Sequence, residues 1–365
     1  RRYILRNKEL KSLLMINSSL TNGGAEHVMV MLANELHKRG YEIDMLIGNE
    51  SAPETYKLDD GIKKIKYHSN GKNGMLYVIN WMRLIRKYQK RKEYTAVISF
   101  MMAQNDITLM AGFGLKQKII VSERANPLLV SEYGKIYKIG EQLLYPTAHR
   151  VVFQTDEVKG YYKRSIQKKG VVIPNPVDPS ITGQWKMPSE KVIVSVGRLT
   201  KQKNYPMLIR AFKRFREEIP GYKLVIYGRG PLLEELKNLS KQLEICNDIE
   251  FAGFSENVDV HIKTASMCVL SSDFEGISNT MIESLAMGVP TICTDCPVGG
   301  ARMLIKSGEN GILVPVGDEH ALADAMISIA QNPKYAIKMG EEAIKIRQEY
   351  DIEKIVDKWE KIILS

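Results

Sequence analysis

The feature that most constrains the fold of this chain is a repeated alternation of short apolar runs with segments of helical period. The run "SLLMINSSL" (residues 12–20) indicates a buried strand, and "GGAEHVMVMLANELHKRG" (residues 23–40) follows as a helix that ends at Gly40. The runs "YEIDMLIG", "TAVISF", "KIIVSE" and "RVVFQT" predict further strands. Strands that alternate with helices pair in parallel, so the sequence predicts an α/β fold with a doubly wound sheet.

A proline-rich stretch divides this series in two. "VVIPNPVDPS" (residues 171–180) predicts a strand that runs into a linker, and a second strand–helix series starts at "KVIVSVGRL". The 365 residues suffice for two domains with separate cores. We expect a first domain over residues 1–178, a second over 179–348 and a final helical segment over 349–365. Ligands of such sheets bind beyond the carboxyl ends of the strands, so the expected site is a cleft that the two domains face.

The net charge of +10 is unevenly distributed. Residues 1–178 hold 29 Lys and Arg against 17 Asp and Glu, whereas residues 179–365 hold 23 against 25. In "RLIRKYQKRKEY", "YGKIYKIGEQLLY" and "YYKRSIQKKG" the basic residues alternate with Tyr, Leu and Ile. This pattern suits an anionic membrane surface or a diphosphate-bearing acceptor, and it equally suits solvated helix faces. The sequence carries no zinc-finger or RNA-binding signature, so we expect no nucleic-acid partner.

Two further classes of protein are not expected. The most apolar stretch, residues 94–115, is interrupted by polar residues at 104–106 and predicts strand, turn and helix rather than a membrane span. The start of the sequence lacks the apolar core of a signal peptide. Cys293 and Cys296 form a C-x-x-C pair, but no second pair completes a zinc site. We therefore expect no bound metal and a cytoplasmic protein.

Two basic residues follow the first strand of the second series. In "VSVGRLTKQKNYPMLIRAF" a strand ends at Gly197, and Arg198 and Lys203 precede a helix that begins near Asn204. Arg binds a phosphate with two parallel hydrogen bonds, and Lys acts as a point charge. The pair therefore suits a diphosphate, although two loop cations without a ligand remain an alternative.

A second loop places acids beside a helix N-terminus. In "SSDFEGISNTMIESLAMGVP" (residues 271–290) a loop with Glu275 and Gly276 leads into a helix. The backbone N–H groups of such a turn bind phosphate oxygens, and the expected contacts are Gly276, Ile277, Ser278, Asn279 and Thr280. Glu283 is placed to bind two ribose hydroxyls, and Glu275 to bind hydroxyls of a sugar beyond the diphosphate. The pattern favours a nucleoside diphosphate sugar; compensation of the helix dipole is the alternative role for either acid.

A glycine pair near the start of the chain also follows a strand. In "TNGGAEH", Gly23 and Gly24 can bring backbone N–H groups close to a phosphate or an acceptor, although the full G-x-G-x-x-G pattern is absent. His27 follows closely and is interpreted as a helix residue rather than a catalyst.

Several of these segments together resemble a known family. "GGAE", "IPNPVD", "SVGRLTKQKN", "YGRGP", "AGFSENV", "SSDFEGISNTMIESLAMGVPTICTD" and "NGILVPVGD" are similar to the retaining glycosyltransferases of family 4, which have the GT-B fold of two Rossmann-like domains. The likeness runs from about residue 12 to the end of the chain and is densest in the second half. It implies that Glu275 and Glu283 form the family's E-x7-E pair and that Arg198 and Lys203 bind the diphosphate. The base-binding loop falls at Phe254 and Ser255, and the final helix is expected to cross back to the first domain.

The resemblance also implies a mechanism. The bond between sugar and phosphate breaks through an oxocarbenium-like state, and Arg198, Lys203 and the helix N-terminus stabilise the departing diphosphate. The leaving phosphate takes the proton of the incoming hydroxyl on the same face, so retention needs no carboxylate nucleophile. The sequence has no D-x-D motif, which is consistent with donor binding without a metal.

The chain departs from the family pattern at one position. Many members carry a histidine at the end of a first-domain strand, where this chain reads "IIVSERANP" (residues 119–127) with Glu123 and Arg124. This form resembles bacterial enzymes that extend lipid-linked or capsular and exopolysaccharide oligosaccharides, often with N-acetylhexosamine or galactose. Arg124 is expected to bind a phosphate or a donor-sugar group, and a salt bridge with Glu123 is the alternative.

These observations lead to one principal hypothesis and three others. The principal one is transfer of a hexose or N-acetylhexosamine from a UDP-sugar to a polyprenyl-diphosphate-linked saccharide, with the basic first domain on the inner face of the cell membrane. The others are the same chemistry on a soluble glucan or protein, a sugar-nucleotide epimerase of the same fold, and a non-catalytic sensor of nucleotide sugars.

Overall fold

A computed structural model of the chain describes residues 11–21, 23–49, 54–68, 74–124 and 135–365, and only the backbone of 135–138. The chain forms two compact units. Unit 1 comprises Arg1–Pro174 and Ile352–Ser365, and unit 2 comprises Asn175–Asp351. The chain therefore changes unit within the proline-rich stretch and again just before its last helix. The segment expected to cross back, residues 349–365, contributes Ile352–Ser365 to unit 1.

Unit 1 is built on a seven-stranded sheet in the order β3-β2-β1-β4-β5-β6-β7, with every neighbouring pair parallel. The strands are β1 (Ser12–Asn17), β2 (Glu42–Ile47), β3 (Lys63–Lys66), β4 (Ala96–Phe100), β5 (Ile119–Ser122), β6 (Arg150–Phe153) and β7 (Gly170–Val172). All residues of β1, β4 and β5 are buried, as expected for strands covered on both faces. The predicted doubly wound parallel sheet is confirmed.

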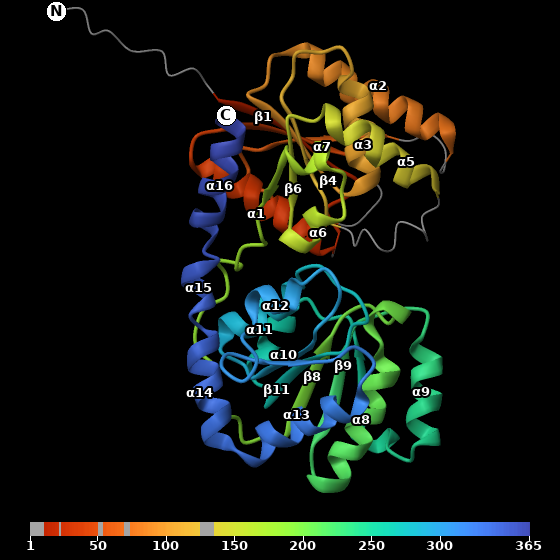
Figure 1. The fold of residues 1–365 in the computed structure, drawn as a ribbon, viewed down its shortest axis with the longest axis vertical. Helices are drawn as coiled ribbons and strands as arrows, with labels where there is room; N and C mark the ends of the chain where they lie inside the picture. Colours follow the sequence, from red (N-terminus) through yellow and green to blue (C-terminus); the bar gives the residue numbers. More distant parts are fainter. Residues whose placement is uncertain (1–10, 22, 50–53, 69–73, 125–134) are drawn as a thin grey trace, which may run out of the picture. The chain divides into compact units, whose positions relative to one another are not determined.

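The helices of unit 1 lie on both faces of this sheet (Figure 1). They are α1 (Gly24–Lys38), α2 (Met75–Arg91), α3 (Met102–Gly112), α5 (Lys135–Leu144), the 3-10 turn η2 (Tyr145–Thr147), α6 (Asp156–Gly160), α7 (Arg164–Gln167) and α16 (Ile352–Leu364). Helix α3 packs between α2 and α5, whereas α1 packs against α16.

The last helix, α16, is tied to unit 1 by both apolar and ionic contacts. Trp359 is almost fully buried, and its ring stacks on Phe100 at the end of β4 with a centroid distance of 5.7 Å. Arg39, just after α1, donates to the carboxylates of Asp357 and Glu360 at 2.6 Å each. These contacts explain why residues from the end of the sequence complete the first unit.

Unit 2 repeats the architecture with a six-stranded parallel sheet in the order β10-β9-β8-β11-β12-β13. The strands are β8 (Val192–Val196), β9 (Lys223–Tyr227), β10 (Ile249–Gly253), β11 (Met267–Leu270), β12 (Thr291–Thr294) and β13 (Ile312–Val314). The strand order reverses between β8 and β11, which are hydrogen-bonded neighbours although two strands separate them in the sequence. Such a reversal leaves a crevice at the carboxyl ends of the two strands.

The helices of unit 2 follow the strands in the manner the sequence predicts. They are η3 (Lys201–Lys203), α8 (Tyr205–Glu218), α9 (Leu233–Gln242), η4 (Cys246–Asp248), α10 (Val258–Lys263), α11 (Asn279–Met287), α12 (Gly300–Leu304), α13 (Glu319–Gln331), α14 (Pro333–Ala343) and α15 (Ile346–Glu349). In α8, Leu208, Phe212 and Phe215 recur at helical spacing and are fully buried, which holds this helix on the sheet beside α13.

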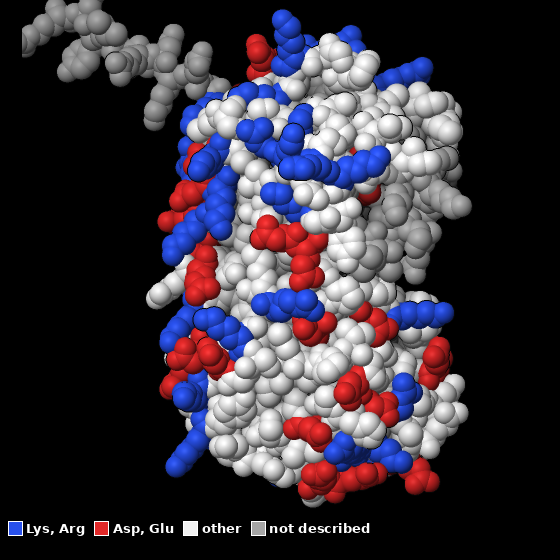
Figure 2. Space-filling view, in the orientation of Figure 1, with Lys and Arg blue, Asp and Glu red and all other residues white. Residues whose placement is uncertain are grey.

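Charged side chains are distributed differently over the two units. In Figure 2, Lys and Arg predominate over unit 1, in the upper part of the view, whereas both signs are mixed over unit 2. This agrees with the excess of basic residues in the first half of the sequence.

Candidate active site

The candidate site lies at the reversal of strand order in unit 2, where two loops leave neighbouring strands. One loop follows β8 and carries Arg198 and Lys203; the other follows β11 and carries Glu275. Because β8 and β11 are parallel and adjacent, their carboxyl ends bring these loops to the same edge of the sheet. Residues that the sequence predicted separately thus belong to one site.

A set of polar contacts joins the two loops. The Asp273 backbone N–H donates to the Gln202 carbonyl at 2.9 Å, and the Asn204 amide donates to Asp273 Oδ1 at 2.6 Å. The Ser271 hydroxyl donates to the Lys203 carbonyl at 2.8 Å. Asn204 has a φ of 41° and caps α8 through its side chain, so the local backbone turns sharply just after Lys203. The position of Lys203 is therefore held from both loops.

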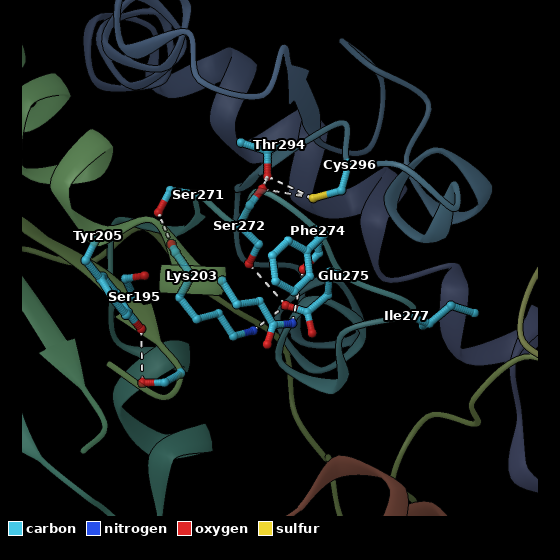
Figure 3. Close-up of polar contacts among 12 residues, drawn as sticks. Ser195, Lys203, Tyr205, Ser271, Ser272, Phe274, Glu275, Ile277, Thr294 and Cys296 are labelled. Atoms are coloured by element: carbon cyan, nitrogen blue, oxygen red, sulfur yellow. Dashed lines mark hydrogen bonds and ion pairs between the residues drawn. The ribbon is translucent and has the colours of Figure 1, made fainter. Parts of the chain in front are cut away.

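Lys203 and Glu275 make a direct contact at the centre of the site. The Lys203 ammonium group donates to Glu275 Oε2, which also accepts a hydrogen bond from the Ser272 hydroxyl at 3.1 Å (Figure 3). Only 14% of the Lys203 side chain and 24% of that of Glu275 are exposed. A partly buried ion pair orients both groups, because each fixes the direction of the other.

Arg198 and Glu283 lie on either side of this arrangement in the sequence. Arg198 follows Gly197 directly and has an exposed side chain, so the loop after β8 presents a guanidinium group to solvent. Gly197 is packed closely by Lys203, since a Cβ atom there would lie 2.9 Å from Lys203 Cε. Glu283 lies at the middle of α11 and is partly buried.

The loop that leads into α11 presents a helix N-terminus. Ser278 is the N-cap of α11 without a capping hydrogen bond from its side chain, and the first turn of the helix holds no acid. The buried Asn175 holds this loop in place, because its side-chain amide donates to the Ile277 carbonyl at 3.2 Å and to Asn279 Oδ1 at 2.8 Å. The Ile277 side chain is buried and points away from the Lys203–Glu275 contact in Figure 3, so its expected contribution is through the backbone.

Gly276 lies in a tight part of this loop. A Cβ atom at Gly300, the first residue of α12, would lie 1.8 Å from the Gly276 carbonyl oxygen. Only a glycine at position 300 permits this close approach of the two backbones. Helix α12 therefore packs against the loop that carries Glu275. Thr280, the second residue of α11, is partly exposed.

The predicted base-binding residues lie just beyond β10. The Phe254 ring is 39% exposed, and the guanidinium carbon of Arg229 lies 5.9 Å from its centroid. Gly253, directly before it, has a φ of 75°, which turns the chain so that Phe254 and Ser255 leave the sheet. An exposed aromatic ring at this edge is suited to stacking on a planar base.

Two of the predicted residues, Gly23 and Gly24, belong to unit 1. Gly23 is the N-cap of α1, and a Cβ atom there would lie 1.9 Å from Glu26 Oε2. A carboxylate of the same helix therefore lies at this turn, where its charge opposes a phosphate. His27 stacks on Tyr56 with a centroid distance of 4.3 Å, which is a packing role.

Arg124, also in unit 1, follows β5 and lies within a buried polar network. Its Nε donates to the Ser122 hydroxyl at 2.8 Å, and its guanidinium carbon lies 4.5 Å from the centroid of the Phe100 ring. The Glu123 carboxylate accepts from the Arg124 backbone N–H at 2.9 Å and from the Tyr145 hydroxyl at 2.7 Å. Burial lowers the pKa of Arg124 to about 9, against the opposing effect of the Glu123 charge. Residues 125–127 of the "SERANP" segment lie outside the described residues.

Comparison with known proteins agrees with this geometry. Two family models match the chain, Glycosyltransferase Family 4 over residues 22–181 and Glycosyl transferases group 1 over residues 181–346. A protein of Campylobacter jejuni, N-acetylgalactosamine-N,N'-diacetylbacillosaminyl-diphospho-undecaprenol 4-alpha-N-acetylgalactosaminyltransferase, is 30% identical over 335 residues, which cover 87% of this chain and 89% of that protein. The chain belongs to glycosyltransferase family 4. The family resemblance inferred from the sequence is confirmed.

Further relatives support the same assignment for this glycosyltransferase. A second transferase of Campylobacter jejuni, named for alpha-1,4-N-acetyl-D-galactosaminyl transfer to a GalNAc-GalNAc-diNAcBac-PP-undecaprenol, is 28% identical over 354 residues and covers 95% of this chain and 97% of its own length. Among solved structures, sucrose-phosphate synthase from Thermosynechococcus elongatus superposes with a TM-score of 0.85 at 17% identity, covering 96% of this chain and 98% of that one. Anabaena HepE in complex with UDP and glucose has a TM-score of 0.82 at 17% identity, covering 97% and 99%. These structural matches establish the GT-B fold.

Two other features of the glycosyltransferase bear on the sequence predictions. Both thiols of the C-x-x-C pair are free and buried, and Cys296 donates to the Ser272 carbonyl at 2.9 Å. Burial raises the pKa of Cys296 to about 11, which disfavours the reactive thiolate. Among the described residues, no helix combines the length and apolar composition needed to cross a bilayer.

Sequence reasoning missed the residues that hold the site of this glycosyltransferase in place. Asn175, Gln202, Asp273 and Gly300 contact the loops rather than contributing the predicted ligand-binding groups. Asn175 lies in an Asn-Pro step and Gly300 in a Gly-Gly pair, and both patterns can be read from the sequence. The residues that they contact cannot be predicted from these patterns, because those residues are distant in the sequence.

Proposed function

We propose that this glycosyltransferase moves a hexose or N-acetylhexosamine from a UDP-sugar, with retention and without a metal, to a hydroxyl of a polyprenyl-diphosphate-linked saccharide at the cytoplasmic face of the membrane. The observation that carries the proposal is the contact of Lys203 with Glu275 beside the N-terminus of α11. A cation held in place, a helix N-terminus without a side-chain cap and an acid at one edge of a sheet match the phosphates and hydroxyls of a nucleotide sugar.

The donor is bound by groups of unit 2. Arg198 and Lys203 bind the diphosphate together with the backbone amides of residues 276–280. Glu283 accepts hydrogen bonds from the ribose hydroxyls, and Glu275 accepts them from the transferred sugar. Phe254 stacks on the base, since its ring is exposed beside the same edge of the sheet, and Ser255 lies next to it.

The chemical step breaks the bond between the anomeric carbon and the diphosphate oxygen, and the electron pair leaves with the UDP. Arg198 and Lys203 stabilise the charge that grows on this oxygen, which lowers the barrier because they are already oriented before the reaction. The acceptor hydroxyl attacks from the same face and passes its proton to the departing phosphate. The positive charge on these two side chains serves where other transferases use a metal ion.

The substrates that we propose are supported by the comparisons with known proteins and by the distribution of charge. The two Campylobacter jejuni relatives are named for transfer to undecaprenyl-diphosphate saccharides, which supports a lipid-linked acceptor. The UDP complex of HepE supports a UDP-sugar donor. The excess of Lys and Arg in residues 1–178 supports contact of unit 1 with an anionic membrane.

Residues of unit 1 are proposed to contact the substrates as well. Arg124 binds a phosphate or a group of the donor sugar, since Ser122 and Phe100 already orient its guanidinium group. The amides of Gly23 and Gly24 contact the acceptor. The carboxylate of Glu26 at that turn favours a hydroxyl over a phosphate, because it repels negative charge.

The test begins with thermal shifts in UDP-, GDP- and ADP-sugars. A donor at about 100 times its Kd stabilises the folded protein by about 2.7 kcal/mol, which corresponds to a rise in Tm of roughly 3–4 °C for a chain of 365 residues. The best donor is then incubated with and without a short-chain polyprenyl-diphosphate saccharide. We expect acceptor-dependent release of UDP and an axial linkage in the product by NMR. A β-linked product, an epimerised donor or donor binding without UDP release would each exclude the proposed reaction.

A further inference from the structure

Unit 1 exposes a group of large apolar side chains on two helices. Met110 and Phe113, at the end of α3, are 41% and 76% exposed, and Ile139 and Leu143 of α5 are 57% and 69% exposed. Ile139 and Leu143 are four residues apart and so share one side of α5. We call these four side chains the α3–α5 face. Exposed apolar clusters of this kind mark surfaces that contact a partner or a membrane.

The fold places the two helices that carry these side chains next to each other. Helix α3 follows β4 and α5 precedes β6, and because all strands of the sheet are parallel, both helices run back toward the amino ends of the strands. They pack closely, since a Cβ atom at Gly140 would lie 2.8 Å from Asp106 Oδ2 (Figure 1). The ends of the two helices that carry Phe113 and Leu143 therefore point in the same direction.

A basic border runs along the other side of α3. From Arg83 to Arg91, helix α2 carries five Lys and Arg and no acid. Arg86 Nη1 donates to the carbonyls of Ala111 and Phe113, at 2.6 and 2.9 Å, so a guanidinium group lies beside the most exposed residue of the α3–α5 face. Lys116, three residues beyond Phe113, is exposed.

We propose that the α3–α5 face inserts into the interface of an anionic lipid bilayer, with the basic side of α2 at the level of the lipid headgroups. The inference rests on the proposed lipid-linked acceptor and specifies how the enzyme reaches it. Apolar side chains bordered by Lys and Arg are the pattern of segments that lie in a membrane interface. Charge complementarity decides the occupant: a second copy of this surface would place like charges together, whereas an anionic leaflet attracts them.

The proposal predicts two contributions to vesicle binding, one from charge and one from burial of apolar side chains, and salt distinguishes them. Attraction of Lys and Arg to the leaflet is screened by salt, whereas burial of Phe113 and Leu143 in the acyl region is not. Transfer of one large apolar side chain out of water changes a partition constant by roughly 10- to 100-fold. Binding to anionic vesicles should therefore weaken in high salt without being abolished.

Phe113→Trp provides a direct measurement. The native tryptophans, Trp81, Trp185 and Trp359, are all buried, so an exposed indole at position 113 reports on its own surroundings. With vesicles of phosphatidylethanolamine and phosphatidylglycerol, we expect a blue shift of emission and quenching by brominated acyl chains. If vesicles sediment the protein but the emission spectrum of the Phe113→Trp variant does not change, this face does not insert, and the proposal is wrong.

A second measurement uses the double variant Phe113→Ser/Leu143→Ser, with Ile337→Ser on α14 of unit 2 as the control at another exposed apolar position. The double variant should lose at least about tenfold in vesicle partitioning, and the control should not. Both should keep wild-type UDP release with a water-soluble, short-chain acceptor. Equal partitioning of the double variant and the wild type, or loss of self-association in place of lipid binding, contradicts the proposal. Absence of transferase activity in the wild type would instead contradict the proposed function and leave the vesicle result standing.

Discussion

The ammonium group of Lys203 and the carboxylate of Glu275 contact each other although 72 positions separate them in the sequence. Each was expected to bind a different part of the donor, and in the structure each is the other's partner. A diphosphate that enters the site must share Lys203 with Glu275. Under the proposed function, the contact would couple the binding of the phosphates by Lys203 to the position of Glu275, the acid assigned to the sugar.

Glu275→Ala should change nucleotide affinity and turnover in opposite directions. Without the carboxylate, Lys203 is available to the diphosphate, and UDP should bind up to about fivefold more tightly, since a partly exposed ion pair contributes about 1 kcal/mol. Loss of the sugar contacts should lower kcat/KM by at least about 30-fold. Calorimetry with UDP and steady-state kinetics measure the two effects, with the exposed Glu217→Ala on α8 as the control. Parallel losses in both would show that Glu275 only supports the loop.

Glu283→Ala tests the ribose assignment. The loss of two hydroxyl contacts to a charged acceptor should cost roughly 2–4 kcal/mol in kcat/KM, or about 30- to 1000-fold. The same variant should discriminate poorly between UDP and 2'-deoxy-UDP, because the carboxylate that recognises the hydroxyl is absent. A reduction of kcat/KM below about threefold contradicts the assignment.

Arg198→Ala should lower kcat more than it weakens donor binding. The guanidinium group is exposed at the loop after β8, and the charge it meets grows as the diphosphate departs. Arg198→Lys should recover part of the rate, since the charge remains without the two-pronged geometry. Lys201→Ala, an exposed cation of the same loop, is the matched control. If donor affinity falls and kcat does not, Arg198 contributes binding alone.

Much of the fold followed from the alternation of apolar runs and helical segments. Buried parallel strands such as β4 and β5 are continuous apolar runs, and this signal is strong because both faces of the sheet are covered. The edge strand β3 carried no such signal, since it contains three Lys and is mostly exposed. Its pairing with β2 comes from backbone hydrogen bonds that any sequence can make.

The candidate site was predictable residue by residue but not in its contacts. Arg198, Lys203 and Glu275 follow strands β8 and β11, and strand ends at a reversal of strand order meet at one edge, so the topology places their loops at the same edge of the sheet. The Lys203–Glu275 contact and the support of the loop by Asn175 depend on side-chain distances that local patterns do not encode. The position of Glu26 at the Gly23 turn is of the same kind.

The buried carboxyl of Asp106 predicts a dependence of stability on pH. Asp106 is 7% exposed, and its Oδ1 has no hydrogen-bond partner among the described residues. Burial, and then the charge of Glu123, raise the pKa of Asp106 to about 7. Between its ordinary pKa of about 4 and this value, the folded state holds a proton that the unfolded state has released. The free energy of unfolding therefore falls as the pH rises from about 4 to about 7. Above pH 7 the ionisation of Asp106 no longer changes it.

Asp106→Asn removes the ionisation while keeping the shape of the side chain. Relative to the wild type, the variant should gain roughly 2–3 kcal/mol of stability between pH 5 and pH 8, because the wild type must bury a charge at the higher pH. Urea unfolding at the two pH values measures this difference, with the exposed Asp60→Asn of the same unit as the control. A stability difference that does not change with pH would mean that Asp106 does not titrate in this range. Because the charge of Glu123 contributes to the raised pKa of Asp106, a stability difference that grows with pH would also show that the two carboxyl groups interact in the folded state.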